Sequence, residues 1–305
     1  MKLVYLYTFF AALVSVALAA PAQNKTEHCI KLAEKDLSVD VPTSRAAPED
    51  VPISIHKLEQ AAAIASQQYC SIQTPGTQVG DAKLLWSSGL VLAFEGTSVT
   101  GRVSWFEDFD FVWSDPDSRY KASLSSGAKI HTGFQIAYTK IADKAMEQVK
   151  SFMKKKNKDK VTVVGHSLGA SIAVLSALHL ETEMQGSVDQ ILTFGQPRVD
   201  NVQFASDVDK HFKDKFYYTI NGADPVARLG PRILGFQHAS GQIWINPASS
   251  TNWKFYPGQE NIHGSISSIP LPLLFVNHIG TYFHTHIDHY YGFWECPAKA
   301  SKDLL

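Results

Sequence analysis

A short glycine-rich turn between a predicted strand and a predicted helix constrains the fold more than any other part of the sequence. The turn reads Gly165-His166-Ser167-Leu168-Gly169, with the β-branched run 161–164 directly before it and the Ala- and Leu-rich stretch 170–184 directly after it. Glycine two positions on either side of a serine permits a turn in which larger side chains would collide with neighbouring backbone. The pattern therefore predicts a strand, a tight elbow that lifts Ser167 out of the sheet, and a helix.

Two other structures are compatible with this turn: a strand-to-helix loop with an inert serine, and a cradle for phosphate. The lysine of a P-loop is missing from the turn, which weakens the phosphate interpretation. By composition, a chain of 305 residues would contain about 0.1 Gly-x-Ser-x-Gly matches by chance. The match alone is only moderately specific, and its position between a strand and a helix is what favours the elbow.

Strand and helix patterns alternate along the rest of the chain. Apolar residues at helical spacing predict helices over 55–69, 134–153 and 170–184, and short apolar or β-branched runs predict strands over 90–94, 161–164, 190–194 and 216–220. Alternation of this kind is typical of an α/β fold with a mostly parallel central sheet and helices on both faces.

Composition excludes several classes of protein. The 305 residues carry 28 basic and 29 acidic side chains, for a net charge of -1, and 45% of them are hydrophobic. This near balance excludes the broad electropositive surface of a nucleic-acid-binding protein. The chain is long and apolar enough for one large domain, predicted over 53–305. The sequence has no Cys or His cluster with metal-ligand spacing, so it predicts neither a metal site nor a cofactor, and it implies no stable protein partner.

The first 52 residues are predicted to lie outside that domain. Lys2, an apolar run and small residues up to Ala20 match a secretory signal peptide over 1–20. An uncleaved membrane anchor is the weaker alternative, because about 18 residues is the lower limit for spanning a bilayer and no stop-transfer charges follow. Residues 21–52 lack sustained periodicity, which predicts a leader, a propeptide or an N-terminal arm. We therefore expect a secreted, extracellular protein.

The chain has three cysteines, Cys29, Cys70 and Cys296. In a secreted chain this number allows one intramolecular disulfide and leaves one thiol over. Cys29 lies in the predicted leader. Cys70 and Cys296 lie near the two ends of the predicted domain, so a bridge between them would join the first helix to the last segment.

A serine nucleophile requires a histidine base and a carboxylate that orients this base, and after an elbow both follow the serine in the chain. Asp224 is the candidate acid because it follows the predicted strand 216–220 after a short turn. Asp200 is its rival, although we expect Asp200 to cap the helix that begins near Val202. The local pattern does not distinguish among the candidate bases, which are His238, His263, His278, His284, His286 and His289.

Several motifs, in the right order, resemble those of the secreted fungal and yeast triacylglycerol lipases. They are FEGT at 94–97, HTGF at 131–134, GHSLGA at 165–170, FGQPRV at 194–199, NGADPV at 221–226 and DHYYG at 288–292. The resemblance covers residues 55–296 and implies an α/β-hydrolase fold with a lid segment. It implies that Ser167 is the nucleophile, Asp224 the acid and His289 the base. It also suggests that Cys70 pairs with Cys296.

Cleavage of an ester places negative charge on the carbonyl oxygen, so donors must be fixed in advance around that oxygen. The elbow predicts one donor, the backbone N–H of Leu168 at the start of the helix. The second donor is expected from the loop after an earlier strand, and the resemblance assigns it to the main-chain N–H and hydroxyl of Thr97. The alternative for Thr97 is a turn hydroxyl that bonds its own loop.

Residues 103–113 combine large apolar rings with acidic side chains, as an amphipathic lid would. The resemblance makes Trp105 the lid tryptophan and Asp108 a partner of Thr97, and the predicted lid also contains Val103 and Phe106. The alternative is an ordinary strand whose aromatic residues fill the core, especially over 109–113, where apolar residues alternate with a period of two. A second apolar stretch, 266–275, is equally compatible with an acyl groove and with a packed surface loop.

These patterns together predict a secreted, cofactor-independent serine hydrolase that cleaves acylglycerol esters at a lipid–water interface. Three alternatives share the fold: a feruloyl-type esterase, a phospholipase A, and a lipase for mono- and diacylglycerols. A more remote alternative is a non-catalytic lipid carrier that keeps the hydrolase scaffold. The aromatic segment after Thr97 argues against the feruloyl esterase, because a soluble substrate requires no amphipathic lid.

Overall fold

An eight-stranded sheet forms the centre of the protein in the computed structural model, which describes residues 42–69, 77–79, 82–86, 89–96, 111–268 and 275–287. Its strands, in spatial order, are β1 (Thr77–Val79), β2 (Ala82–Trp86), β3 (Leu90–Phe94), β6 (Val161–His166), β7 (Val188–Phe194), β9 (Phe216–Asn221), β11 (Gln242–Ile245) and β12 (Trp253–Tyr256). β3, β6, β7, β9 and β11 run parallel, and antiparallel strands complete both edges. The sheet is therefore mostly parallel, as predicted.

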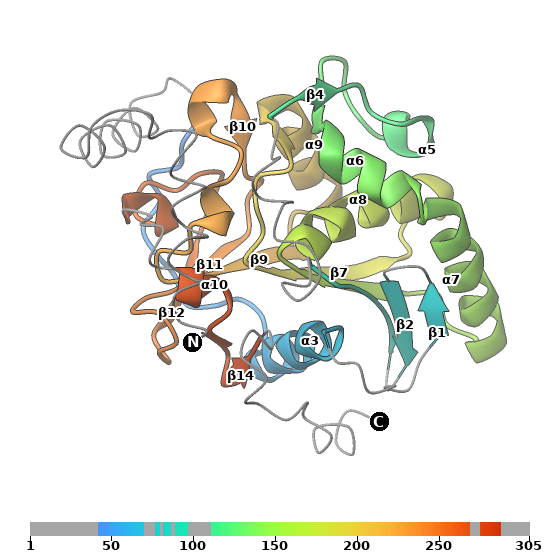
Figure 1. Ribbon diagram of the computed structural model, residues 1–305, viewed down its shortest axis with the longest axis horizontal. Helices are drawn as coiled ribbons and strands as arrows, with labels where there is room; N and C mark the ends of the chain where they lie inside the picture. The colour runs from blue at the N-terminus through green and yellow to red at the C-terminus, as the bar shows by residue number, and fades with distance from the viewer. Residues whose placement is uncertain are drawn as a thin grey trace, which may run out of the picture.

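Helices cover both faces of this sheet (Figure 1). One face carries α6 (Thr132–Thr139), α7 (Ala142–Lys156), α8 (Leu168–Glu183) and α9 (Val202–Phe212). The opposite face carries α3 (Ile55–Gln67) and the small hairpin β13 (Thr281–Tyr282) and β14 (Thr285–His286). In the described part of the chain, no helix is long and apolar enough to cross a bilayer.

The central strands are apolar on both sides because helices pack on both sides. In β6, Val163 belongs to the hydrophobic cluster under α6 to α9, whereas its neighbour Val164 belongs to the cluster under α3. Successive side chains of a strand point to opposite faces, so a continuous β-branched run is suited to a sheet with two covered faces. α8 is buried around most of its circumference, which agrees with its Ala- and Leu-rich sequence.

A second, four-stranded sheet lies beside the main one. Its order is β10 (Phe236–Gln237), β8 (Asp200–Asn201), β5 (Ile130–His131) and β4 (Trp113–Ser114). The Trp113 ring stacks on Phe236 with ring centroids 3.9 Å apart, and Phe111 meets the same ring edge-on at 5.9 Å. In the predicted lid stretch, Trp113 thus lies in a strand, and the half-buried rings of Phe111 and Trp113 pack on Phe236, whereas residues 103–110 lie outside the described residues.

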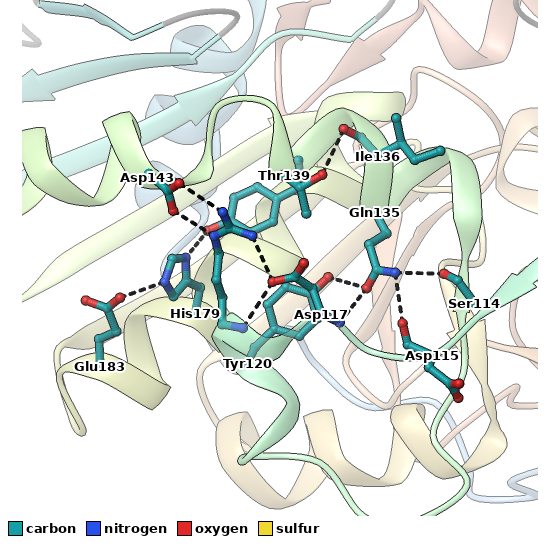
Figure 2. Close-up of polar contacts among 12 residues, drawn as sticks. Ser114, Asp115, Asp117, Tyr120, Gln135, Ile136, Thr139, Asp143, His179 and Glu183 are labelled. Atoms are coloured by element: carbon teal, nitrogen blue, oxygen red, sulfur yellow. Dashed lines mark hydrogen bonds and ion pairs between the residues drawn. The ribbon is translucent and has the colours of Figure 1, made fainter.

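Side-chain hydrogen bonds join the short helix α5 (Ser118–Lys121) to the helices behind it (Figure 2). Arg119 donates from Nε and Nη2 to the two carboxylate oxygens of Asp143 on α7, at 2.7 and 2.9 Å. The Tyr120 hydroxyl donates to Gln135 on α6 at 2.6 Å. Farther along the same group of contacts, Figure 2 shows His179 and Glu183 on α8.

Three features differ from the sequence predictions. The helix expected over 134–153 is two helices, α6 and α7, with Ile141 between them as the N-cap of α7. The N-cap of α9 is Asn201, whose side chain accepts a hydrogen bond from the N–H of Phe204, and not Asp200. Asp200 pairs in β8 instead. The strands β1 and β2 at one edge of the sheet, and β11 and β12 at the other, were not predicted, because such short strands carry little periodicity.

The segment just before the predicted domain lies along the edge strand β12. Glu49 and Phe255 exchange backbone hydrogen bonds of 2.9 and 3.0 Å, and the Ser44 N–H donates to the carbonyl of Gln259 at 2.9 Å. Residues 42–50 thus contact the body of the domain in the way that an N-terminal arm would. The remaining short elements are η1 (Val226–Arg228), η2 (Arg232–Leu234), η3 (Ser265–Ser267) and α10 (Phe275–His278).

Candidate active site

Ser167 lies at a strained elbow between β6 and α8. Its backbone adopts φ 58° and ψ -129°, a conformation that side-chain-bearing residues rarely take. Two backbone hydrogen bonds of 3.0 Å hold this geometry: the Ser167 N–H donates to the Phe194 carbonyl, and the Ser167 carbonyl accepts from Ala170. Strain of this kind at a strand-to-helix turn is typical of a nucleophile elbow.

The two glycines of the motif are required because backbone approaches them closely. A Cβ at Gly165 would lie 2.3 Å from the carbonyl oxygen of Gly169, and a Cβ at Gly169 would lie 2.4 Å from the carbonyl oxygen of Phe94. These distances are far shorter than any van der Waals contact between carbon and oxygen. The steric reason predicted from the sequence is therefore confirmed.

The turn after β9 brings a carboxylate and an imidazole together. Oδ2 of Asp224 lies 2.8 Å from Nδ1 of His278, the last residue of α10, and both side chains are buried. Oδ1 of the same carboxylate accepts the N–H of Val226 at 2.8 Å. Because a carboxylate accepts hydrogen bonds, Nδ1 of the neutral imidazole carries its proton, and Nε2 keeps the lone pair that a general base uses.

Two further contacts hold the His278 segment against the sheet. Asn221, at the end of β9, donates from Nδ2 to the carbonyl of Asn277 at 2.8 Å and accepts the N–H of Ser249 at 2.7 Å. The His278 ring also stacks on His166, the neighbour of Ser167, with ring centroids 4.6 Å apart. The imidazole that contacts Asp224 therefore lies beside the elbow.

A buried ion pair fixes the loop that follows Asp224. Arg198 donates from Nε and Nη2 to the two carboxylate oxygens of Glu260, at 2.7 and 3.1 Å, and both side chains are fully buried. Burial alone would raise the pKa of Glu260, but the guanidinium of Arg198 holds it well below its ordinary value. Nη1 of Arg198 donates to the carbonyls of Arg228 and Gly230 at 3.2 and 3.1 Å, which anchors this loop.

Asp200, the rival acid, has a different environment. Burial, and then the negative charges of Asp209 and Glu260, raise the pKa of Asp200 well above its ordinary value. A carboxyl group that favours its neutral form is poorly suited to stabilise an imidazolium. The geometry and the electrostatics both favour Asp224.

The sequence matches known lipases along most of its length. The model of the family "Lipase (class 3)" matches residues 91–233. A secreted mono- and diacylglycerol lipase of Malassezia restricta, LIP4, is 43% identical over 278 residues, which cover 86% of this chain and 91% of the relative. A secreted mono- and diacylglycerol lipase of Malassezia globosa, MDL2, is 40% identical over 84% of this chain and 90% of its own length.

The chain belongs to the class 3 lipase family. The solved structure of a fungal lipase–inhibitor complex, titled as a model for interfacial activation, superimposes with a TM-score of 0.63 at 27% identity. The match covers 75% of this chain and 94% of that one. The α/β-hydrolase fold predicted from the sequence is thereby confirmed.

The residues predicted to act in this class 3 lipase fall into two groups. Ser167, Asp224 and Leu168 lie in the described part of the chain, and Leu168 is the first residue of α8, where a backbone N–H has no intrahelical acceptor to reach. The other predicted site residues lie outside the described residues; these are Cys70, Cys296, Thr97, Val103, Trp105, Phe106, Asp108 and His289. Residues 269–274 of the second apolar stretch also lie outside the described residues.

In the described part of the chain, a histidine other than the one that the resemblance implied contacts Asp224. His289 lies outside the described residues, whereas His278 receives the contact that the orienting acid makes. His278 is therefore a candidate base beside His289. His278 was one of six candidates, and its local sequence carried no signal that set it apart. Its contact with Asp224 follows from the packing of α10 against the end of β9, which a linear pattern does not report.

Ser167 is only 4% exposed. The side chain is therefore buried at the elbow between β6 and α8.

Proposed function

We propose that this class 3 lipase is a secreted serine hydrolase that cleaves acylglycerol esters with Ser167 as nucleophile, His278 as general base and Asp224 as the orienting acid. The 2.8 Å contact between Asp224 and Nδ1 of His278, beside the strained Ser167 elbow, carries this proposal. The relatives' names support the substrate class and the extracellular location.

In the first half of the reaction, the Ser167 hydroxyl attacks the ester carbonyl and gives its proton to Nε2 of His278. The carbonyl becomes a tetrahedral oxyanion, and its collapse breaks the ester bond. The imidazolium then returns the proton to the leaving glyceride oxygen, so that an acyl-serine remains. Asp224 stabilises the imidazolium through the hydrogen bond from Nδ1 of His278. The same hydrogen bond keeps the neutral ring in the tautomer whose Nε2 can accept a proton.

In the second half, water replaces the serine hydroxyl. His278 takes a proton from the water as it attacks the acyl carbonyl, and returns this proton to the Ser167 oxygen when the fatty acid leaves. We assign the oxyanion donors of both halves to the backbone N–H of Leu168 and to Thr97.

The names of the two relatives, both mono- and diacylglycerol lipases, support mono- and diacylglycerols as the substrates of this protein. We further propose that residues 103–108 act as a lid, with Trp105 facing the site when closed and a lipid surface when open. The exposed apolar side chain of Val276, two residues before His278 and 56% exposed, would lie near the same lipid surface.

The proposal is tested with a fluorophosphonate probe and a panel of substrates. Ser167→Ala should abolish labelling, and His278→Ala should abolish both labelling and hydrolysis of monoolein and diolein, whereas His289→Ala should keep both. Labelling that persists in Ser167→Ala would reject the nucleophile. Activity that depends on His289 and not on His278 would restore the original base.

Substrate choice needs its own comparison. Rates on monoolein, diolein, triolein, phosphatidylcholine and methyl ferulate, each measured through its solubility limit, separate the related activities. We expect the partial glycerides to be preferred, with a rise in rate as their aggregates form. A preference for methyl ferulate without such a rise would identify a soluble esterase instead.

A further inference from the structure

The hydroxyl of Tyr69, two residues beyond the end of α3, makes two hydrogen bonds next to the elbow. It lies 2.6 Å from Nδ1 of His166 and accepts the backbone N–H of Gly96 at 3.1 Å. The opposite nitrogen of the same imidazole, Nε2, lies 2.9 Å from the backbone carbonyl of His278. A single chain of hydrogen bonds therefore runs from Gly96 through Tyr69 and His166 to the candidate base.

The direction of each bond follows from the groups at its ends. The His278 carbonyl only accepts, so Nε2 of His166 carries the ring proton. A neutral imidazole has one N–H, hence Nδ1 is an acceptor and the Tyr69 hydroxyl donates to it. The oxygen of that hydroxyl accepts the N–H of Gly96. Each donor in the chain meets one acceptor.

The surroundings favour this neutral form of His166. The side chain is 1% exposed, and burial followed by repulsion from His278 lowers the pKa of His166 well below its ordinary value of 6.5. The Tyr69 and His166 rings meet edge-on, 5.6 Å apart and at 78°. Two rings in that arrangement restrict each other's orientation.

The two ends of this series of hydrogen bonds lie at two different parts of the candidate site. Gly96 immediately precedes Thr97, the proposed oxyanion donor, and a Cβ at Gly96 would lie 2.3 Å from the Tyr69 hydroxyl and 2.8 Å from the Cβ of Ser167. At the other end, the His278 carbonyl belongs to the residue whose ring contacts Asp224. The same carbonyl also accepts the Tyr282 hydroxyl at 3.1 Å.

We propose that Tyr69 and His166 are positioning residues that set the distance between the oxyanion loop at Gly96 and the base His278. Neither group touches the substrate. Catalysis by preorganised donors requires that the oxyanion position and the base be fixed together, and a shift of about 1 Å in either lowers the rate about 100-fold. The inference rests on the proposed function, because it takes His278 as the base.

The first test is Tyr69→Phe, which removes one oxygen and keeps the ring. Tyr138→Phe is the matched control, since the Tyr138 hydroxyl contacts Nδ1 of His179 at 2.7 Å away from the elbow. With p-nitrophenyl butyrate, and sites counted with a fluorophosphonate, Tyr69→Phe should lower kcat about tenfold or more and leave KM within about twofold. Tyr138→Phe should keep the kcat of the wild type. Equal kcat values for both variants would overturn the proposal.

The second test asks whether the hydrogen bond or merely the bulk of His166 matters. His166→Gln keeps an N–H that can reach the His278 carbonyl, whereas His166→Met fills a similar volume without a donor. We expect kcat to recover at least about fivefold in His166→Gln relative to His166→Met, at similar thermal unfolding midpoints. Equal kcat values for the two variants would indicate a packing role for His166 and reject its role in positioning His278 through a hydrogen bond.

His278→Ala distinguishes a failure of the proposed triad from a failure of the positioning role of Tyr69 and His166. If His278→Ala stays active, the proposed base is wrong, and the positioning role of Tyr69 and His166 is overturned with it. If His278→Ala is inactive while Tyr69→Phe and His166→Met keep wild-type kcat, only the positioning role fails and the triad stands.

Discussion

Two tyrosine–histidine pairs in this protein share almost the same local geometry. Tyr69 and His166 meet at 2.6 Å with ring centroids 5.6 Å apart, and Tyr138 and His179 meet at 2.7 Å with centroids 6.0 Å apart. In each pair the tyrosine hydroxyl contacts Nδ1, and the rings are nearly perpendicular, at 78° and 81°. The pairs differ in what Nε2 of each histidine reaches.

Nε2 of His166 reaches the backbone carbonyl of the candidate base, whereas Nε2 of His179 lies 2.8 Å from the carboxylate of Glu183, one helical turn along α8 (Figure 2). That carboxylate in turn meets Lys150 of α7 at the surface. The first pair is therefore connected to the reacting groups, and the second joins two helices. We therefore expect the same local motif to serve catalysis in the first pair and the packing of helices in the second, according to the partner at its far end.

The largest expected difference is between His278, which the first pair contacts, and His179, the histidine of the second pair. His278→Ala should lower kcat by about 10,000-fold or more, because the general base is lost. His179→Ala should leave kcat per titrated site unchanged, although the folded protein is destabilised. Steady-state kinetics with active-site counting measures both. A comparable loss of kcat in His179→Ala would show that the second pair also serves catalysis.

The second largest difference is expected in how the stability contributed by each pair depends on pH. The pKa of His166 is lower in the folded protein than its ordinary 6.5, so its contribution is complete above pH 6.5 and is lost as pH falls below that value. The loss should approach about 1.4 kcal/mol per pH unit. Urea unfolding of the wild type and of His166→Gln between pH 7 and pH 5 measures the contribution of His166. The same pH dependence of the free energy of unfolding in both proteins would contradict the prediction.

Glu183 should respond in a lower pH window. Its hydrogen bond from Lys150 lowers the pKa of Glu183 against the opposing effect of burial, and the contact with His179 lowers it further. Its contribution is therefore present above about pH 4.5 and is lost as pH falls through the lowered pKa. Glu183→Gln should match the wild-type pH dependence down to about pH 4.5 and differ only below it. A difference near pH 6 would reject this assignment.

Deletion of one hydroxyl should cost more stability in the structural pair. Tyr138 is fully buried, so Tyr138→Phe leaves a buried ring nitrogen without its donor, which costs about 1 to 3 kcal/mol. Tyr69 is partly exposed, and its replacement by Phe should cost about 1 kcal/mol or less. Urea unfolding of both variants tests this order. The reverse order would mean that Tyr69 is chiefly a stabilising residue.

The smallest effect is expected at the surface end of the second pair. The Lys150 side chain is 48% exposed, and exposed ion pairs contribute about 0 to 1 kcal/mol. Lys150→Met should therefore change the free energy of unfolding by less than about 1 kcal/mol, with unchanged kcat. A larger loss that disappears in 1 M salt would show that the ion pair is stronger than its exposure implies.

Much of the fold was predictable because its signals are local. β3 has the predicted bounds Leu90–Phe94, and α8 begins directly after the glycine-flanked serine, since hydrophobic periodicity and steric demands at the turn act within a few residues. The edge strands and the break between α6 and α7 were missed. Their positions depend on pairing and packing with distant segments, which local propensity does not encode.

The sequence by itself determined the elbow at Ser167, the steric need for Gly165 and Gly169, and the place of Asp224 after a strand, since neighbours along the chain enforce each of these. Only the tertiary structure showed that His278 contacts Asp224, and that the His166 ring contacts the backbone carbonyl of His278. These contacts join residues 54 and 112 positions apart. Separations of that size are closed by the packing of the sheet and its helices, not by any pattern in the chain.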